Sequence, residues 1–574
     1  MIRLSPRQRL LLDDTLLISI MAVLAACGLI YEYLLSHYAA RVLGSMETVI
    51  YAMIGIMIVS MGLGAFAAKH IKDPFKGFAW LEVNVALLGC SATIILASLT
   101  GFTLALPSII ANTFSIPQDM LPLGGLYQQL VSVTEVLPYC FGFVLGFLIG
   151  MEIPLIARIR EHVYGKHLAN NVGTIYGADY IGAGVGAAVW VLIMLKLEIN
   201  QAAAITASLN LIAGGCFLWR HFKHIKQGTL LIICHLVLLV MIVMVYSLGG
   251  RWSEKMQDLL YLDKVVYQQQ TRFQNLVFTQ RDMSGEMGSI YSFYINGRLQ
   301  FSSLDEQIYH QMLVHPAMAI SARQEKVLVI GGGDGLALRE VLQWPVEQVT
   351  LIDLDDELVA LFKQPERFLP PHLADKMSSL TQGSFSDPRV ELFHNDAFVQ
   401  IEQLLAQGQL YDSVIIDLPD PSHPDLNKLY SKHFYAKVRQ LLAADGALVV
   451  QSTSPFHAKH AFISIGKTVA AAGFQHTQQY HQNVPSFGEW GWTIATKMGA
   501  SPEQRINTMM APWPMEFSWL NEAVLKAAFV FPHRFYDSAP DVEVNELGSH
   551  TLYHYHHNAW QSEMGVFIEP ETRP

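Results

Sequence analysis

Seven long apolar segments occupy the first 250 residues and constrain the fold of this chain more than any other feature. Each holds about 20 residues, enough at a helical rise of about 1.5 Å per residue to cross the hydrocarbon core of a bilayer. The chain is 51% hydrophobic and only 15% charged, whereas soluble domains are about one quarter charged. We therefore expect a transmembrane domain of about seven helices over residues 1–250. The segments lie roughly at 15–35, 48–68, 79–103, 131–156, 173–195, 199–219 and 229–248.

The first apolar segment and the basic loops predict how these helices are arranged. More apolar segments follow the first one, without a cleavage site, so we expect it to be retained rather than removed as a signal peptide. Basic residues gather before the first segment and after the second, fourth and sixth, which places the N-terminus in the cytoplasm. Seven crossings would then leave the C-terminal part outside. An eighth crossing, or a re-entrant segment over 79–117, would return it inside but would put Arg158 and Arg160 on the wrong side, so the side stays open.

Three carboxylates lie within or at the ends of the apolar segments: Glu135, Glu152 and Asp179. A charge is costly there, so such groups usually face a protein interior or a water-filled cavity. One interpretation is a polar pathway or binding site between helices. The other, which we favour, is a carboxyl group paired with Arg158, a tyrosine or a backbone group.

The second part of the chain is acidic. It carries 24 Lys+Arg and 37 Asp+Glu after residue 250, against 14 and 12 before it, so its formal charge is near −13. This balance argues against nucleic acid as a partner and is compatible with a cationic small molecule. The five cysteines lack the spacing of a metal site or a disulfide framework.

Short β-branched and aromatic runs replace the long apolar segments after residue 262. They predict a small β-subdomain with a connecting helix over 262–322. Strands and helices then alternate, which predicts a Rossmann-like, doubly wound α/β catalytic domain over 323–500, with a last strand near Gly491–Thr496. Residues 501–574 are left as a C-terminal extension.

A glycine turn and a set of acidic residues mark the predicted ligand site. Gly331–Gly335 follows the buried strand Lys326–Ile330, as in nucleoside sites where an acid ending the next strand holds ribose. The carboxyl ends of parallel strands meet at one crevice, and close carboxylates require a neutralising cation. We therefore expect a positively charged ligand. The acids just beyond successive strands are Asp334, Asp353, Asp396, Asp417 and Asp420.

A series of short motifs runs in order through this half of the chain: Gln274, Asn296–Gln300, Asp305–Glu306, Tyr309–His310, Gly331–Gly335, Asp353, Asp396–Ala397, Asp417–Pro421 and Tyr430–Tyr435. The series resembles the spermidine/spermine synthase family over about 262–498, and the apolar segments resemble its long multi-pass bacterial form. The resemblance implies transfer of an aminopropyl group from decarboxylated S-adenosylmethionine to putrescine, giving spermidine and methylthioadenosine. It further implies no cofactor besides this co-substrate, no metal, and a place in the bacterial inner membrane.

The resemblance also implies a role for each matched residue. Asp417 would be the general base, and Asp420 would help to hold the diamine. The implied acceptor-binding residues are Tyr309, His310, Asp420 and Phe487. The implied donor-binding residues are Gln274, Gln300, Gly331, Asp334 for the aminopropyl ammonium, Asp353 for the ribose, Asp396 for the adenine amine, and Ala397.

Three departures from the family pattern concern the acceptor. Leu418 and Pro419 stand where the family usually has small hydroxylated residues, and Phe487 stands where it has tyrosine. These differences put the identity of the acceptor amine in doubt more than binding of the donor.

Other functions are weighed against aminopropyl transfer. A methyltransferase would bind intact S-adenosylmethionine, whose carboxylate Asp334 would repel, so electrostatics favours the decarboxylated donor. A lyase or hydrolase acting on the donor is a second alternative. A third is a membrane polyamine transporter or sensor with a binding-only α/β domain, in which Glu152 and Asp179 would serve transport. The sequence leaves open whether the chain forms a homo-oligomer.

The C-terminal extension holds the histidine-rich string His554–His557. Such a string can ligate metal, but no second cluster of ligands accompanies it. We therefore expect a surface helix end and no metal there.

Overall fold

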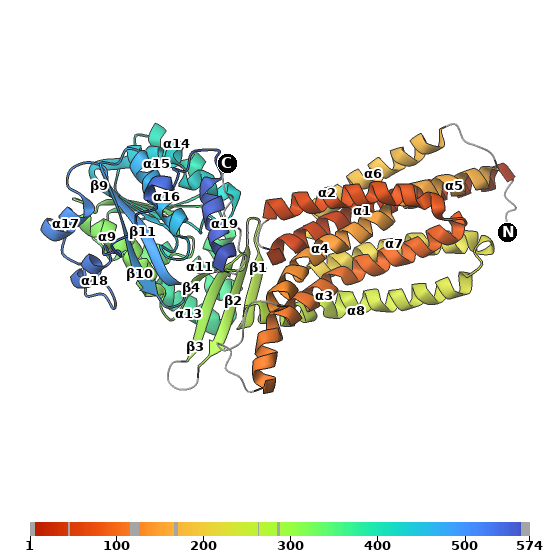
Figure 1. The fold of residues 1–574 in the computed structure, drawn as a ribbon, viewed down its shortest axis with the longest axis horizontal. Helices are drawn as coiled ribbons and strands as arrows, with labels where there is room; N and C mark the ends of the chain where they lie inside the picture. The colour runs from red at the N-terminus through yellow and green to blue at the C-terminus, as the bar shows by residue number, and fades with distance from the viewer. Residues whose placement is uncertain are drawn as a thin grey trace. The chain divides into compact units, whose positions relative to one another are not determined.

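A computed structural model of the chain describes residues 6–43, 46–114, 126–165, 170–261, 263–283 and 288–563. The chain divides into two compact units, Met1–Leu262 and Asp263–Pro574. The first is helical and the second is α/β, coloured from red to yellow and from green to blue in Figure 1.

The first unit is a bundle of long helices that lie side by side (Figure 1). Within the described residues, seven segments are long and apolar enough to cross a membrane, with α4 and α5 joined in one of them. The predicted helical domain is thus confirmed. Its helices are α1 Pro6–Leu43, α2 Met46–Ala67, α3 Pro74–Phe114, α4 Leu126–Gly150, α5 Glu152–Tyr164, α6 Asn171–Leu192, α7 Ile199–His221 and α8 Gly228–Leu260, with short 3-10 helices η1 Ala68–His70, η3 Met194–Lys196 and η4 Phe222–His224.

The surface of this bundle is apolar. Ile58, Val59, Phe66 and Trp219 are among the large apolar side chains that are more than half exposed. A helix satisfies its own backbone hydrogen bonds and can present such a surface to lipid, whereas patches of this extent are rare on soluble monomers.

The helix α3 bears on the re-entrant alternative. It is one continuous helix from Pro74 to Phe114, with Pro107 inside it. A segment that turned back on itself would interrupt the helix, so the described residues speak against it; residues 115–117 lie outside the described part.

Two arginines of the bundle form hydrogen bonds within it. Arg160 donates to Asp14 at 2.6 Å and to the side chain of Asn171 at 2.8 Å. Arg158 donates to the carbonyl of Ile71 at 2.7 Å, and no hydrogen bond from it to the buried Glu152 is found among the described residues. Of the partners expected for the three carboxylates, Arg158 is therefore not the one that Glu152 contacts.

The second unit begins with a four-stranded antiparallel sheet of order β1-β2-β3-β4. The residues that face inward, such as Phe278, Phe293 and Phe301, are fully buried. This confirms the predicted β-subdomain: the runs expected at 276–280 and 289–295 form β2 and β3, and the structure adds β1 before them and β4 after them. Its strands are β1 Lys264–Gln270, β2 Asn275–Asp282, β3 Ser289–Ile295 and β4 Arg298–Ser302.

The main sheet of this unit has seven strands in the order β10-β11-β9-β8-β5-β6-β7. The pairs of β9, β8, β5, β6 and β7 are parallel, and β11 joins β9 and β10 antiparallel. This is the predicted Rossmann-like sheet, and its strand order reverses between β5 and β8. The strands are β5 Lys326–Gly331, β6 Gln348–Asp353, β7 Val390–His394, β8 Tyr411–Asp417, β9 Leu442–Gln451, β10 His476–Val484 and β11 Gly488–Thr496.

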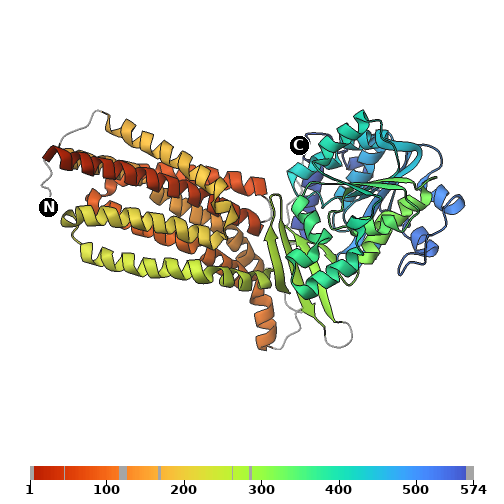
Figure 2. The same ribbon diagram turned by 180° about the vertical axis from the view of Figure 1, so that it is seen from behind.

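Helices cover both faces of this sheet, which is seen from behind in Figure 2. Side chains of β5 alternate between two cores: Val327 and Val329 pack with α9 and α10, and Leu328 and Ile330 pack with α14 and α15. The helices are α9 Glu306–Ile320, α10 Leu336–Leu342, α11 Asp356–Lys363, α12 Pro365–Phe368, α13 Pro371–Thr381, α14 Ala397–Ala406, α15 Lys432–Leu441, α16 Lys459–Ala471, α17 Pro502–Thr508, α18 Glu522–Ala527 and α19 Thr551–Glu563, with 3-10 helices η5 Ser384–Ser386, η6 Pro424–Tyr430 and η7 Ala539–Asp541.

The residues after β11 return to the sheet. The edge strand β10 receives a hydrogen-bond partner from them, because the backbone N–H of His481 donates to the carbonyl of Ala528 at 3.0 Å. Phe529 packs on Tyr480 with ring centroids 5.2 Å apart.

Candidate active site

The glycine turn after β5 lies against two of the predicted acids. Gly331 has φ +80°, and a Cβ there would lie 2.0 Å from the carbonyl oxygen of Asp417. A Cβ at Gly333 would lie 2.6 Å from Oδ2 of Asp353. At Gly331 only glycine combines this φ with so close an approach. A Cβ at Gly332 would lie 3.3 Å from Oδ2 of Asp417, so the carboxylates of Asp353 and Asp417 both lie against the turn.

Asp334 and Asp353 form the part of the site next to the turn. Oδ1 of Asp334 accepts the N–H of Leu336 at 3.0 Å, and Oδ1 of Asp353 accepts that of Asp355 at 2.9 Å. Burial, followed by the charges of Asp355 and Asp334, raises the pKa of Asp353 to about 7. Burial is also the main cause of the raised pKa of Asp334. A ligand that is cationic, or that donates hydrogen bonds, would stabilise the charged form of both.

Asp417 lies at the carboxyl end of β8, opposite the same turn. Its Oδ1 accepts a hydrogen bond from the hydroxyl of the buried Tyr309 at 2.7 Å. Burial and the negative charge of Asp334 raise the pKa of Asp417 to about 6, and the bond from Tyr309 opposes the rise. This carboxylate is ionised at neutral pH yet basic enough to take a proton in a reaction.

A buried network of charges supports Tyr309 from behind. His310 donates from Nδ1 to Glu306 at 2.9 Å, and Arg339 binds both carboxylate oxygens of Glu306 at 2.9 and 3.0 Å. Burial disfavours the charge on His310, but Glu306, Asp334 and Asp417 together raise its pKa to about 8. His310 is therefore a buried, charged residue of α9 that supports the neighbouring Tyr309.

Sequence reasoning missed Arg339 and Glu340, which complete this network with a contact of 2.8 Å. A signal was present, because both are charged residues in a helix whose other positions are mostly apolar and buried. Such residues rarely enter a core unless they are paired.

Phe487 lies in the turn between β10 and β11, beside Tyr309. Their ring centroids are 5.9 Å apart with an edge-to-face arrangement. The turn is fixed by Asp305, which accepts hydrogen bonds from the N–H and the hydroxyl of Ser486 at 2.7 and 2.8 Å. An aromatic ring thus stands next to the Asp417–Tyr309 pair.

Asp420 lies beyond Asp417 and is surrounded by donors. Its Oδ1 accepts from Nε2 of Gln451 at 3.1 Å, and its Oδ2 lies 3.4 Å from Oγ1 of Thr453. Gln451 also donates to the hydroxyl of Tyr430 at 3.1 Å. Burial disfavours the charge of Asp420, but the hydrogen bond and charge of His556, then the bond from Gln451 and the charge of Arg298, lower its pKa overall.

The histidine-rich string was expected on the surface, and for one of its members this is wrong. His556 is 1% exposed, and its Nε2 lies 3.1 Å from Oδ2 of Asp420. His554, two residues earlier on α19, is exposed as expected. The two differ because the face of α19 that bears Leu552 and His556 is turned toward the interior of the α/β unit, whereas His554 lies on the other face.

The remaining residues predicted to bind the donor have contacts of their own. Asp396 caps α14 by accepting the N–H of Phe398 at 2.9 Å, and its other oxygen pairs with Lys428 at 2.6 Å. Ala397, the first residue of α14, is buried. Gln274 is half-buried beside β2, and Gln300 bonds the carbonyl of its neighbour Arg298 at 3.1 Å. Asp396 must share its carboxylate with Lys428 if it also binds a ligand.

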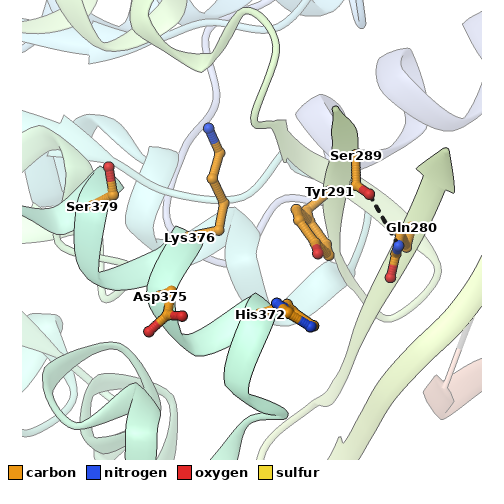
Figure 3. A pocket seen from close by; sticks show the side chains of 7 residues that line it. All are labelled: Gln280, Ser289, Tyr291, His372, Asp375, Lys376 and Ser379. Carbon is orange, nitrogen blue, oxygen red and sulfur yellow. Dashed lines mark hydrogen bonds between the residues drawn. The ribbon is translucent and has the colours of Figure 1, made fainter. Parts of the chain in front are cut away.

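A hollow elsewhere in this unit has none of these residues in its lining. It is open, encloses about 620 Å³ and lies between the β2–β3 hairpin and α13 (Figure 3). Its polar groups, including His372, Asp375 and Lys376, do not bond one another in Figure 3, where only Gln280 and Ser289 are joined. The convergence of acids at the glycine turn, rather than the size of this hollow, identifies the candidate active site.

Comparison with known proteins bears on both units. Residues 306–507 match the family model described as "Spermine/spermidine synthase domain". A polyamine aminopropyltransferase of Shewanella oneidensis is 55% identical over 554 residues, which cover 96% of each chain. Polyamine aminopropyltransferase 1 of Streptomyces coelicolor is 34% identical over 88% of each chain. The crystal structure of spermidine synthase from Thermotoga maritima is 25% identical, with a TM-score of 0.39, over 48% of this chain and 87% of that chain.

Proposed function

The chain belongs to the polyamine aminopropyltransferase family, and from this premise we propose that it moves the aminopropyl group of decarboxylated S-adenosylmethionine to putrescine. The products are spermidine, methylthioadenosine and a proton. The observation that carries this proposal is the convergence of Asp334, Asp353 and Asp417 on the glycine turn after β5. A sulfonium nucleoside with an ammonium tail has the positive charges that such a group of carboxylates requires.

The donor would lie along the turn. Asp353, with a pKa raised to about 7, would gain its charge as it accepts the ribose hydroxyls. Asp334 would bind the aminopropyl ammonium, and Asp396 the adenine amine. Gly331, Ala397, Gln274 and Gln300 would line the rest. Intact S-adenosylmethionine would bring its carboxylate close to Asp334, and this repulsion favours the decarboxylated donor over a methyltransferase substrate.

The acceptor would enter between Asp417 and Asp420. A sulfonium is a good leaving group, so the main task is to align a neutral amine with the methylene carbon that it attacks. An alkylammonium has a pKa of about 10 and is not nucleophilic. Asp417 would therefore take a proton from the attacking nitrogen, while Asp420 holds the second ammonium. Tyr309 would position Asp417. Phe487 and His310 would form the part of the acceptor site next to Tyr309.

The experiment uses the full chain purified in detergent, with decarboxylated S-adenosylmethionine and putrescine. Methylthioadenosine and spermidine in equal amounts support the proposal. Methylthioadenosine without spermidine would indicate a lyase or hydrolase, and binding without turnover would indicate a sensor or transporter. Asp417→Asn should retain donor binding and lose transfer. The exposed Asp425 supplies a matched control, since Asp425→Asn changes an acid of the same loop outside the site.

The seven apolar helices support a further part of the proposal, that the enzyme spans the bacterial inner membrane. Its substrates are made in the cytosol, which favours a C-terminal unit inside, whereas the distribution of basic residues favours one outside. A reporter fused to the C-terminus, active on only one side of the membrane, distinguishes the two. A chain that washes from membranes in carbonate would contradict the membrane assignment.

A further inference from the structure

Asp420 is contacted by a residue from the far end of the chain. Nε2 of His556 lies 3.1 Å from Oδ2 of Asp420, across 136 residues of sequence. His556 is 1% exposed and the Asp420 side chain is 12% exposed. Because the carboxylate is held in its charged form, the imidazole nitrogen is the donor in this bond.

The helix that carries His556 is fixed to the segment that follows Asp420. Nδ2 of Asn427 in η6 donates to Oδ1 of Asn545 at 3.0 Å, and Nδ2 of Asn545 returns a bond to the carbonyl of Asn427 at 3.0 Å. The backbone of Tyr553 at the start of α19 donates to Oδ1 of Asn427 at 3.3 Å. These bonds hold α19 independently of His556, so the imidazole occupies a defined place next to Asp420.

The oxygen of Asp420 that His556 contacts is also approached by a residue that follows β9. Thr453, which lies 3.4 Å from Oδ2 of Asp420, has φ +59°. A β-branched residue rarely adopts this conformation, and where it does the surrounding structure must hold it. Here the N–H of Thr453 is held by Oε1 of Gln451 at 2.8 Å. Asp420 is therefore enclosed between β9 and α19.

We propose that His556 is a specificity-determining residue that closes the far end of the acceptor site behind Asp420. This inference rests on the proposed function, in which Asp420 holds the second ammonium of a diamine. A diamine would end at Asp420. An acceptor that carries a further aminopropyl group on that nitrogen would have to place it where the imidazole lies. The site thus accepts a diamine and rejects the triamine it has made.

Spermine is the product that reports a second aminopropyl transfer. In the first transfer a bond forms between the amine nitrogen and the aminopropyl carbon, the carbon–sulfur bond breaks, and one proton leaves. A second transfer would consume spermidine and another donor, and would release spermine, another methylthioadenosine and another proton. The ratio of spermine to spermidine therefore reports how well the far end is closed.

The experiment compares wild type, His556→Ala and His556→Gln in the full chain, with putrescine or spermidine as acceptor. We expect wild type to use spermidine poorly. His556→Ala should raise the ratio of kcat/KM for spermidine to that for putrescine by about tenfold or more, the scale of one methylene of misfit in a pocket. His556→Gln keeps a side-chain N–H donor within reach of Asp420, so its ratio should stay close to that of the wild type. The KM for the donor should not change.

His554→Ala is the matched control, because it removes an exposed imidazole from the same helix and should leave the ratio unchanged. Equal use of the two acceptors by the wild type would overturn the inference, as would an unchanged ratio in a folded His556→Ala enzyme. If His556→Ala does not fold, His556→Asn takes its place as the shortened side chain. The inference would then be overturned if the spermidine-to-putrescine ratio of His556→Gln departed from wild type as far as that of His556→Asn. A wild type that makes no methylthioadenosine with any amine would instead refute the proposed function and this inference with it.

Discussion

Replacing Tyr309 by phenylalanine tests the proposed base directly. The hydroxyl of Tyr309 donates to Oδ1 of Asp417 at 2.7 Å, and this bond holds down a pKa that burial and Asp334 raise to about 6. A hydrogen bond to a charged group contributes about 1.5–3 kcal/mol, and one pKa unit corresponds to about 1.4 kcal/mol. Loss of the hydroxyl should therefore raise the pKa of Asp417 by about one to two units.

The assay is the pH dependence of kcat/KM for the acceptor, followed by release of methylthioadenosine from about pH 5 to 9. A base must be deprotonated to act, so a higher pKa moves the acidic limb of Tyr309→Phe to higher pH. Tyr430→Phe is the control, because that hydroxyl donates to the carbonyl of Pro419 at 2.9 Å and its loss should leave the limb in place. An acidic limb that stays fixed, or moves to lower pH, in Tyr309→Phe would refute Asp417 as the group that titrates.

Three further changes have definite expected results. Asp334→Asn removes the charge that raises the pKa of Asp417, so the acidic limb should move to lower pH while the KM for the donor rises; a limb that moves upward would contradict this. Arg339→Met removes one of the two cationic partners of the buried Glu306 and leaves only His310, at a cost of up to about 3–5 kcal/mol, read as a lower melting temperature at pH 7. Because Glu306 has a pKa lowered to about 2 from 4.5, its contribution to stability should be complete above pH 4.5 and lost toward pH 2. Gly331→Ala places a Cβ 2.0 Å from a carbonyl oxygen, and it should abolish transfer in whatever enzyme folds.

The sheet and its acids could be predicted from the sequence because their signals are local. Val327 to Ile330 form an unbroken apolar run, and a glycine turn follows at once, so a buried strand and a ligand loop are both indicated. The acids Asp353 and Asp417 end strands of the same kind. The strand order then brings them together without further information.

The strand β10 and the role of His556 could not be predicted because their signals are not local. Residues 476–484 carry mostly polar side chains, and β10 is stabilised by pairing with β11 and by Phe529 from the C-terminal segment. The contact between His556 and Asp420 joins distant parts of the chain. One signal was available, since Leu552 and His556 are four residues apart and therefore share a helix face.

The C-terminal segment also protects the sheet from other chains. The strand β10 is the last in its sheet, and an uncovered edge of this kind invites a strand from a second molecule. By donating to Ala528, His481 uses an edge N–H within its own chain. A nascent chain that has been synthesised only as far as β11 therefore has an unpaired strand edge at β10, and this edge is covered only when the segment that carries Ala528 and Phe529 has emerged and folded back.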